Sequence, residues 1–431
     1  MAKKYENMIH YFTPEDVSSF GPWCHSPQPY LHGEQAIPGS NLTAGFQVIT
    51  APVTLEDAPI MHREEETMFF LGAALPDVFA AWDAEIHFYM GPALDRLEKI
   101  VITEPTAVRV PANYWHGPLK FVRVDKPVLY QAAMFTGKPG YIKKVQTSDG
   151  DMLEFIEGEA HRAPHVGERP SVPWSAVNED GVELYTEKGA YDDAKAPDWE
   201  KCARVPGYVP IYYSDATTLL KPKPELSRDI AKSLLAMPKE ITDWGSWMPN
   251  PKTYLRGQSY MEDANYHIGW QVFTEACNME EPHFHQGKDE YLFFMGANPM
   301  DMFDFDAEID IMIGEDADHM EAYRINRPCV IRFPANVWHC PILFRKMRKP
   351  LLFQAAFQDG VWGTITRSEA PENAKKKAYF SRKYVYDYMG DNVRRCKFNE
   401  NKVCIICGKC FPRMDEIEKK DREEREKEDK A

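Results

Sequence analysis

Two nine-residue segments, VPANYWHGP at residues 110–118 and FPANVWHCP at residues 333–341, are identical at six positions. They belong to a series of paired segments that occur in the same order in both halves of the chain. The other pairs are GPWCHSPQPYLHGEQ (21–35) with GSWMPNPKTYLRGQS (245–259), FQVIT (46–50) with WQVFT (270–274), MFFLGA (68–73) with LFFMGA (292–297), DAEIHFYMG (83–91) with DAEIDIMIG (306–314), and KPVLYQAAMF (126–135) with KPLLFQAAFQ (349–358). The offset is 224 for the early pairs and 223 for the later ones, so the copies are nearly gap-free. The chain therefore contains two homologous domains.

Within each copy the apolar runs are short and rich in Val, Ile, Phe and Tyr, and Pro, Gly and Asp separate them. Runs of this kind predict β-strands, and their regular spacing predicts a sandwich or barrel. The 33 prolines and 25 glycines of the chain also favour many turns over a helical bundle. We therefore expect an all-β fold.

The second copy contains a compact set of metal-ligand side chains in EEPHFHQGKDEYLFFMG, residues 280–296. Side chains alternate along a strand, so His283 and His285 point to the same face. Glu290 joins them if residues 286–289 form a turn or bulge before the next strand. This pattern predicts a metal site that takes a fourth ligand from elsewhere in the chain.

The spacing His283-x-His285-x4-Glu290-x5-Gly296 resembles the first cupin motif, and the segment from Pro334 to His339 resembles the second. The resemblance covers residues 21–137 and 245–360 and implies a bicupin, with two tandem jelly-roll barrels. It also implies one divalent transition metal, Mn, Fe, Co, Ni or Zn, bound by His283, His285, Glu290 and His339. From the family we further expect a small-molecule substrate and a homo-oligomer.

The first copy matches this pattern only in part. Glu66 and His116 align with the glutamate and the last histidine of the second copy, whereas Pro59 and Met61 fall opposite the first two histidines. His62 is displaced by one residue and faces the wrong way unless the loop slips. Two interpretations stay open: a weak second metal site of His62, Glu66 and His116, or a barrel that serves only stability or pairing.

Four regions follow from these patterns. We expect an N-terminal cupin domain at 1–137, an irregular connector at 138–244, a C-terminal cupin domain at 245–365, and a Cys-rich, charged tail at 366–431. ELSRDIAKSLLAMPKE, residues 225–240, is the best helical candidate, within the connector. The tail contains a structural zinc candidate, with an iron–sulfur cluster as the alternative, formed by Cys396, Cys404, Cys407 and Cys410.

Several other residues lie on segments expected to line or rim the second barrel, where they are candidates for a catalytic or substrate pocket. They are equally compatible with ordinary barrel filling. These residues are Arg256, Tyr260, Arg332, Trp338 and Gln354. Glu280 and Glu281 are candidates for a base, or for two solvated acids.

The net charge of −15 argues against binding to nucleic acid or to an acidic membrane surface. The sequence has no apolar stretch of the roughly 20 residues that a membrane helix needs and no hydrophobic core of a secretory signal. We therefore expect a cytoplasmic protein.

The ligand set and the resemblance favour an enzyme over a metal- or small-molecule-binding bicupin without catalysis, which is the non-enzymatic alternative. The leading hypothesis is hydrolytic C–C cleavage of a small enolisable ring, such as a cyclic β-diketone derived from a polyphenol (dihydrophloroglucinol-like). An Fe(II) dioxygenase that cleaves a diol or flavonol ring is the runner-up, and decarboxylation of a small diacid comes third.

Overall fold

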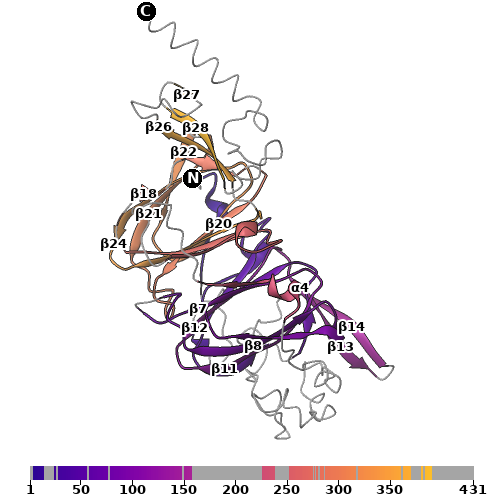
Figure 1. Cartoon of the computed structure of the whole chain (residues 1–431). Coiled ribbons are helices and arrows are strands. Elements are labelled where there is room, and N and C mark those ends of the chain that lie inside the picture. The colour runs from indigo at the N-terminus through magenta and orange to yellow at the C-terminus, as the bar shows by residue number, and fades with distance from the viewer. Residues whose placement is uncertain are drawn as a thin grey trace, which may run out of the picture. The chain divides into compact units, whose positions relative to one another are not determined.

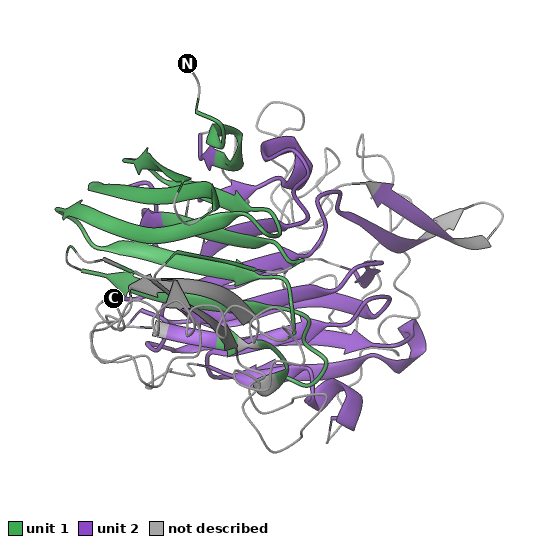
Figure 2. Ribbon diagram, turned by 90° about the horizontal axis from the view of Figure 1, so that it is seen from above, with its two compact units in different colours: residues 1–9, 255–294, 305–431 green, residues 10–254, 295–304 purple. Residues whose placement is uncertain are grey.

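The computed structural model describes residues 3–13, 24–25, 28–55, 58–75, 78–147, 150–157, 226–237, 252–274, 276, 278–279, 282–285, 287–316, 319–360, 363–369, 380–381 and 384–390. It contains two compact β-rich units (Figure 1, Figure 2). One unit contains residues 10–254 and 295–304, and the other contains residues 1–9, 255–294 and 305–431. The sheets at the centre of these units are called the N-terminal barrel and the C-terminal barrel below.

The N-terminal barrel contains two antiparallel sheets. The first has the order β15-β10-β7-β12-β4-β2, with β3 on β4; the second has the order β14-β13-β6-β11-β8-β9, with β5 on β11. The strands of the first are β2 (Cys24–His25), β3 (Tyr30–Leu31), β4 (Thr43–Ile49), β7 (Glu66–Gly72), β10 (Thr106–Val110), β12 (Val128–Met134) and β15 (Leu234–Ala236). Those of the second are β5 (Val53–Leu55), β6 (Ile60–Met61), β8 (Ala84–Gly91), β9 (Glu98–Ile102), β11 (Trp115–Val124), β13 (Gly140–Thr147) and β14 (Gly150–Glu157).

The C-terminal barrel repeats this arrangement. Its first sheet has the order β1-β23-β20-β25-β17-β16; its second has the order β22-β21-β24-β19-β26-β28-β27, with β18 on β24. The first contains β1 (Ile9–Tyr11), β16 (Lys252–Arg256), β17 (His267–Phe273), β20 (Glu290–Gly296), β23 (Cys329–Phe333) and β25 (Leu351–Phe357). The second contains β18 (Asn278–Met279), β19 (His283–Phe284), β21 (Ala307–Asp316), β22 (His319–Ile325), β24 (Trp338–Met347), β26 (Gly363–Glu369), β27 (Phe380–Ser381) and β28 (Tyr384–Gly390).

The two sheets of each barrel face one another across an aromatic core. In the N-terminal barrel, Phe70 on β7 lies 6.1 Å from Phe121 on β11, measured between ring centroids. In the C-terminal barrel, Phe294 on β20 lies 6.4 Å from Phe344 on β24, and Phe273 stacks on Phe344 at 4.4 Å. The paired sequence segments therefore build the same core twice, and the predicted all-β fold of two jelly-roll barrels is confirmed.

Helices are short in the described part of the chain. They are η1 (Glu6–Met8), α1 (Gly33–Ala36), η3 (Leu94–Arg96), α4 (Arg228–Ala231) and η4 (Gly257–Ser259). The glycine of the Tyr-Leu-x-Gly repeat begins both α1 and η4. Gly33 and Gly257 have φ angles of +50° and +49°, and a Cβ atom on either would lie 2.3 Å from a carbonyl oxygen. Only glycine fits this conformation and this close approach, which explains why both copies contain it.

The segment 225–240, predicted to be one helix, instead contains α4 and then β15. Leu234 to Ala236 pair with β10, and the Arg109 amide donates to the Ser233 carbonyl at 2.8 Å. Ile230 of α4 packs into the core of the N-terminal barrel. Edge pairing and burial thus outweigh the helix propensity of this segment.

Strands also occur where a connector and a tail were predicted. β13 and β14 form a hairpin that extends the second sheet of the N-terminal barrel past residue 137 (Figure 1). β26 and β28 continue the C-terminal barrel past residue 365, and β26 pairs with β19. The four tail cysteines and the predicted zinc site lie outside the described residues. Cys329 and Cys340 are buried, and neither forms a disulfide.

Candidate metal centres

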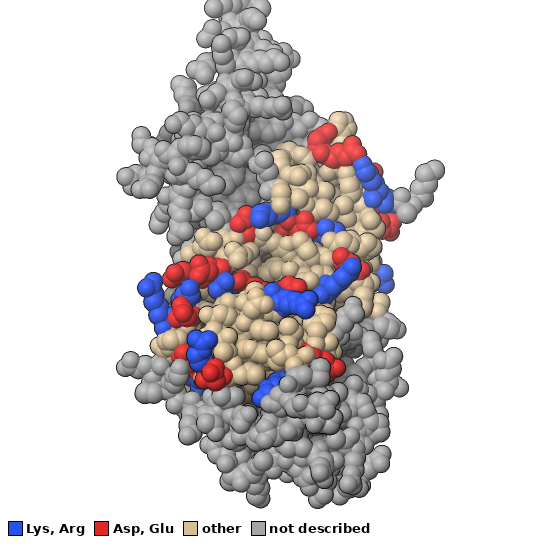
Figure 3. Space-filling model, turned by 90° about the vertical axis from the view of Figure 1, so that its right-hand side faces the viewer, with Lys and Arg blue, Asp and Glu red and all other residues tan. Residues whose placement is uncertain are grey.

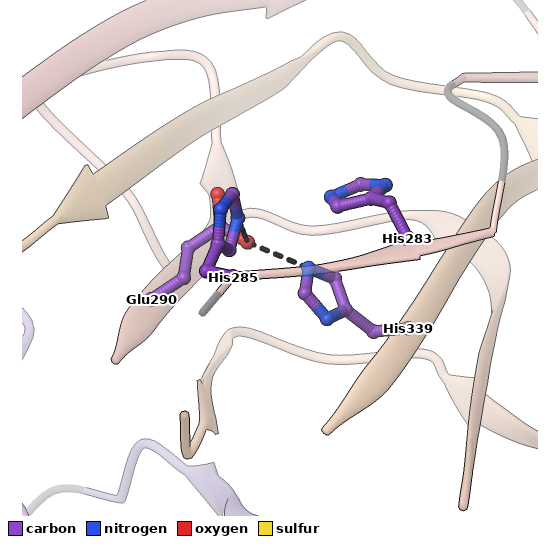
Figure 4. Close-up of side chains that lie close together, drawn as sticks. All are labelled: His283, His285, Glu290 and His339. Atoms are coloured by element: carbon purple, nitrogen blue, oxygen red, sulfur yellow. Dashed lines mark hydrogen bonds and ion pairs between the residues drawn. The ribbon is translucent and has the colours of Figure 1, made fainter. Parts of the chain in front are cut away.

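Three strands position the four predicted ligands of the C-terminal barrel. His283 on β19 lies directly opposite His339 on β24, so their side chains share one face. His285 follows two residues after His283 on the same face, and Glu290 begins β20. Figure 4 shows the four side chains converging on one point between these strands.

The donor atoms of this cluster lie close together and away from solvent. One atom from each of His283, His285, Glu290 and His339 falls within 4.8 Å of the others. Glu290 Oε2 lies 2.9 Å from His339 Nε2 and 3.3 Å from His285 Nε2. Gly287, between His285 and Glu290, lies in a turn and has a φ of +73°. All four residues are at most 7% exposed.

Glu290 stays ionised despite its burial. Burial alone would raise its pKa, but the charge and hydrogen bond of His285, together with those of His339, outweigh burial. The pKa of the Glu290 carboxyl is therefore held well below its usual range. The cluster thus combines a buried carboxylate with three imidazoles, a donor set suited to first-row divalent metals.

The low pKa of Glu290 predicts how acid affects the metal-free protein. Because the folded-state pKa lies below the ordinary value of 4.5, the stabilisation by the carboxylate is complete above that pH and is lost as the pH falls toward the folded-state pKa. Glu290→Gln lacks this contribution. The difference in free energy of unfolding between wild type and variant, from urea titrations of chelator-treated protein, is expected to narrow below pH 4.5. A difference that widens there would contradict this assignment.

Backbone groups and aromatic rings orient the ligands. His339 Nδ1 lies 2.9 Å from the Val337 carbonyl, so an Nδ1–H donates there and Nε2 points into the cluster. Phe333 stacks on the His339 ring at 4.2 Å, and Phe357 packs against the His285 ring at 4.4 Å. The wall of the cluster is therefore aromatic and apolar.

The motif Pro-Ala-Asn explains how the last histidine is placed. Asn336 adopts a φ of +67°, and its backbone N–H donates to the His285 carbonyl at 2.9 Å. Asn113 adopts a φ of +63°, and its backbone N–H donates to the His62 carbonyl at 2.8 Å. Asparagine tolerates this left-handed conformation better than most residues. The same turn thus joins the two ligand segments in both barrels.

These matching hydrogen bonds show that His62 is the structural counterpart of His285. Only three residues separate His62 from Glu66, against four between His285 and Glu290. The loop between His62 and Glu66 is therefore one residue shorter, and this change brings His62 to the position that a second site requires. Ile60 lies opposite His116 just as His283 lies opposite His339. Ile60 therefore occupies the place of the first histidine.

The slip brings the three remaining ligands of the N-terminal barrel together. His62, Glu66 and His116 offer donor atoms within 4.8 Å of one another, and all three side chains are buried. Glu66 Oε2 lies 3.2 Å from His116 Nε2 and 3.5 Å from His62 Nε2. His62 Nδ1 lies 2.8 Å from the Gly140 carbonyl, which turns Nε2 toward Glu66.

Three of the five predicted pocket residues, Arg332, Trp338 and Gln354, face away from the ligands, and the roles of Arg256 and Tyr260 stay predictions. Arg332 pairs in register with Tyr291, whereas Glu290 pairs with Phe333, so Arg332 lies on the opposite face of the sheet from Glu290. Strand alternation likewise directs Trp338 away from His339, and Gln354 away from the core residue Phe353. Trp338 packs on Phe284 at 4.9 Å. Tyr260 is half-buried beside η4, and the side chain of Arg256 is outside the described residues.

Arg332 instead forms an ion pair that supports the ligand loop. Its Nε donates to Asp289 Oδ2 at 2.8 Å, and Asp289 Oδ1 accepts the Ala335 amide at 3.0 Å. Arg109 Nε donates to Glu65 at 2.7 Å at the matching place in the N-terminal barrel. Both pairs are largely buried.

Arg332→Met is therefore expected to affect stability more than the metal site. The change leaves Asp289 without its cation in a mostly buried position and should lower the free energy of unfolding by about 3 kcal/mol. Arg109→Met is the matched variant in the other barrel. Urea unfolding measures both, and Mn(II) titration should show little change for Arg332→Met. A large loss of Mn(II) affinity with unchanged stability would show that Arg332 serves the site directly.

His267 is a residue that the sequence patterns did not single out. It pairs in register with Phe357, whose ring packs against His285, and it is 8% exposed. Its ring centroid lies 6.2 Å from that of Phe357. The aligned position in the first copy is Thr43, so the only available signal was this difference between the repeats.

The surface and the helices add two observations. On the face drawn in Figure 3, acidic and basic side chains are interspersed over the described residues. In the C-terminal barrel, Arg324 and Arg345 both form ion pairs with Asp310. Among the described residues, no helix is long and apolar enough to cross a membrane.

Two jelly-roll barrels in one chain, each with a His/Glu cluster between facing strands, give this protein the architecture of a bicupin. No protein-family model matches the sequence, and no curated protein is significantly similar to it. Among solved structures, the chain is similar to oxalate decarboxylase from Bacillus subtilis at pH 4.6, with 10% identity, 83% of this chain and 78% of that chain covered, and a TM-score of 0.44. A structure of the same enzyme concerned with its Mn(II) centres gives 9% identity, coverage of 83% and 79%, and a TM-score of 0.46. Sequence identities and TM-scores this low say nothing about the reaction that this chain catalyses.

Proposed function

We propose that the C-terminal barrel is a metal-dependent hydrolase that opens a small cyclic β-diketone. The observation that carries the proposal is the buried, ionised Glu290 held between His285 and His339 inside an aromatic wall. A divalent metal, when bound by the four ligands, would supply Lewis acidity toward one carbonyl or enolate oxygen of the substrate. A cyclic 1,3-diketone offers such an oxygen at either carbonyl and forms a stabilised enolate.

The residues of the chain suit a flat, weakly acidic substrate. Two positive charges on the metal and one negative charge on Glu290 leave one positive charge, which matches an enolate monoanion. Phe333 and Phe357 provide apolar surface for a carbocyclic ring beside the charged centre. His267, one strand away from Phe357 in the same register, is a candidate for handling a proton at the edge of this site.

The reaction is a hydrolysis and consumes water only. For 1,3-cyclohexanedione, the bond between one carbonyl carbon and the central carbon breaks, hydroxyl adds to the carbonyl carbon and a proton adds to the central carbon. The product is 5-oxohexanoate. The 5-hydroxy derivative, dihydrophloroglucinol, gives the corresponding hydroxylated keto acid.

The test is anaerobic turnover of these two diketones by protein loaded with Mn(II) or Fe(II), with the products followed by mass spectrometry. Wild type is expected to form the keto acid under nitrogen, and His283→Ala/His339→Ala is expected to form none. Turnover that requires oxygen would instead support the ring-cleaving dioxygenase. Absence of product from both diketones, in protein shown to hold the metal, would overturn the proposal.

A further inference from the structure

The loop that follows His285 is held by the turn that carries the last metal ligand. Two neighbouring residues of this turn bind the loop at three points. The Asn336 backbone N–H donates to the His285 carbonyl at 2.9 Å, and the Ala335 N–H donates to Asp289 Oδ1 at 3.0 Å. Between these two bonds, the Gly287 N–H donates to the side-chain Oδ1 of Asn336 at 3.2 Å. The turn thus holds the loop at its start, its middle and its end.

The middle of this loop depends on the Asn336 side chain. The end of the loop has further anchors, since Asp289 Oδ2 accepts the Arg332 guanidinium at 2.8 Å and the Asp289 carbonyl accepts the Gln358 N–H at 3.3 Å. Gly287 has a φ of +73°, and a Cβ added there would contact nothing within 4 Å. Glycine samples many backbone conformations unless its surroundings restrict it. The Asn336 oxygen is therefore the group that fixes the backbone in the middle of the loop.

The N-terminal barrel has the same turn without this side-chain bond. Asn113 has nearly the same φ as Asn336, and its backbone N–H likewise donates to the histidine that begins the loop, His62. Among the described residues, the Asn113 side chain forms no hydrogen bond. The loop after His62 is one residue shorter. The side-chain bond of Asn336 therefore accompanies the longer loop and the four-ligand cluster.

We propose that Asn336 is a positioning residue of the C-terminal metal centre, whose side-chain oxygen holds the loop so that His285 faces the other ligands before a metal binds. Without this bond, the metal-free loop also adopts conformations that turn His285 away. The apparent metal affinity then falls in proportion to the fraction of chains that remain competent to bind. Both partners of the bond are exposed and compete with water. Its loss should therefore lower the Mn(II) affinity by about fivefold, or about 1 kcal/mol.

The experiment uses the full chain carrying Glu66→Gln, so that the measured Mn(II) binding comes from the C-terminal site, after metal has been stripped with a chelator. The EPR signal of free Mn(II) gives the affinity. Asn336→Gly keeps the left-handed backbone and removes the oxygen, and it is expected to bind Mn(II) about fivefold more weakly. Asn336→Asp retains an acceptor oxygen in a residue that tolerates this conformation, so its affinity should stay within about twofold of the parent. Titration in about 0.5 M KCl screens the added negative charge.

Asn113→Gly is the matched control, because it makes the same backbone change in a turn that lacks the side-chain bond. It should leave the Mn(II) affinity of the C-terminal site unchanged. Urea unfolding of the chelator-treated chains separates the two roles, since a purely structural Asn336 would change the unfolding midpoint and leave the Mn(II) affinity as in the parent.

Equal Mn(II) affinities of Asn336→Gly and the parent would overturn the proposal. A loss of affinity in Asn336→Asp as large as that in Asn336→Gly would also overturn it, because the effect would then not come from the acceptor oxygen. A parent chain that binds no Mn(II) would overturn it together with the metal centre. None of these outcomes depends on the diketone hydrolysis proposed above.

Discussion

Replacing Glu290 with glutamine is expected to lower the Mn(II) affinity of the C-terminal barrel by about a hundredfold or more, or about 3 kcal/mol. Glutamine has almost the same shape, so the histidines and the aromatic wall should keep their places. The change removes the only negative charge among the four ligands, and that charge is already developed because His285 and His339 depress the pKa of Glu290. The metal then meets four neutral donors in an apolar surrounding.

Glu66→Gln is the matched variant, because Glu66 begins β7 as Glu290 begins β20. EPR titration of wild type should show a tight and a weaker class of Mn(II) site. Glu290→Gln should lose the tight class, and Glu66→Gln should lose only the weaker one. Mn(II) is the suitable probe because thiolates bind it poorly, so the tail cysteines do not compete. Retention of tight binding in Glu290→Gln would show that the cluster is not the metal site.

The sequence allowed the C-terminal ligands to be predicted because local rules were sufficient there. Strand alternation placed His283 and His285 on one face, and the resemblance of the segment from Pro334 to His339 to the second cupin motif supplied the last ligand. The same rules left the N-terminal site open, since the position of His62 depends on a loop that is one residue shorter. Long-range contacts fix that loop: Ile60 pairs with His116, and the His62 carbonyl accepts the backbone amide of Asn113.

Other predictions failed because a shift of one residue along a strand moves a side chain to the opposite face of the sheet. Arg332, Trp338 and Gln354 lie on the correct strands, but their side chains point away from the ligands, because a strand reverses its face at every residue. The predicted helix at 225–240 was lost to a sheet edge that is distant in sequence.

Ile60→His is expected to convert the N-terminal triad into a four-ligand site and to raise its Mn(II) affinity by about tenfold or more, or about 1.4 kcal/mol. The register supports this change, since Ile60 faces His116 as His283 faces His339. Histidine and isoleucine are similar in size, so the barrel should accept the imidazole without large rearrangement. Without metal, a buried imidazole in an apolar place should lower the free energy of unfolding by about 1–3 kcal/mol.

The titration uses the His283→Ala/His339→Ala chain, so that the measured Mn(II) binding comes from the N-terminal site alone. Met61→His is the control, because Met61 lies next to Ile60 on the opposite face of β6. Ile60→His should bind Mn(II) more tightly and regain thermal stability when Mn(II) is added, and Met61→His should do neither. Equal effects of the two variants would mean that the register of β6 with β11 does not place residue 60 at the metal. A gain confined to Ile60→His would show that the two barrels share one ligand geometry and differ by the residue in this position.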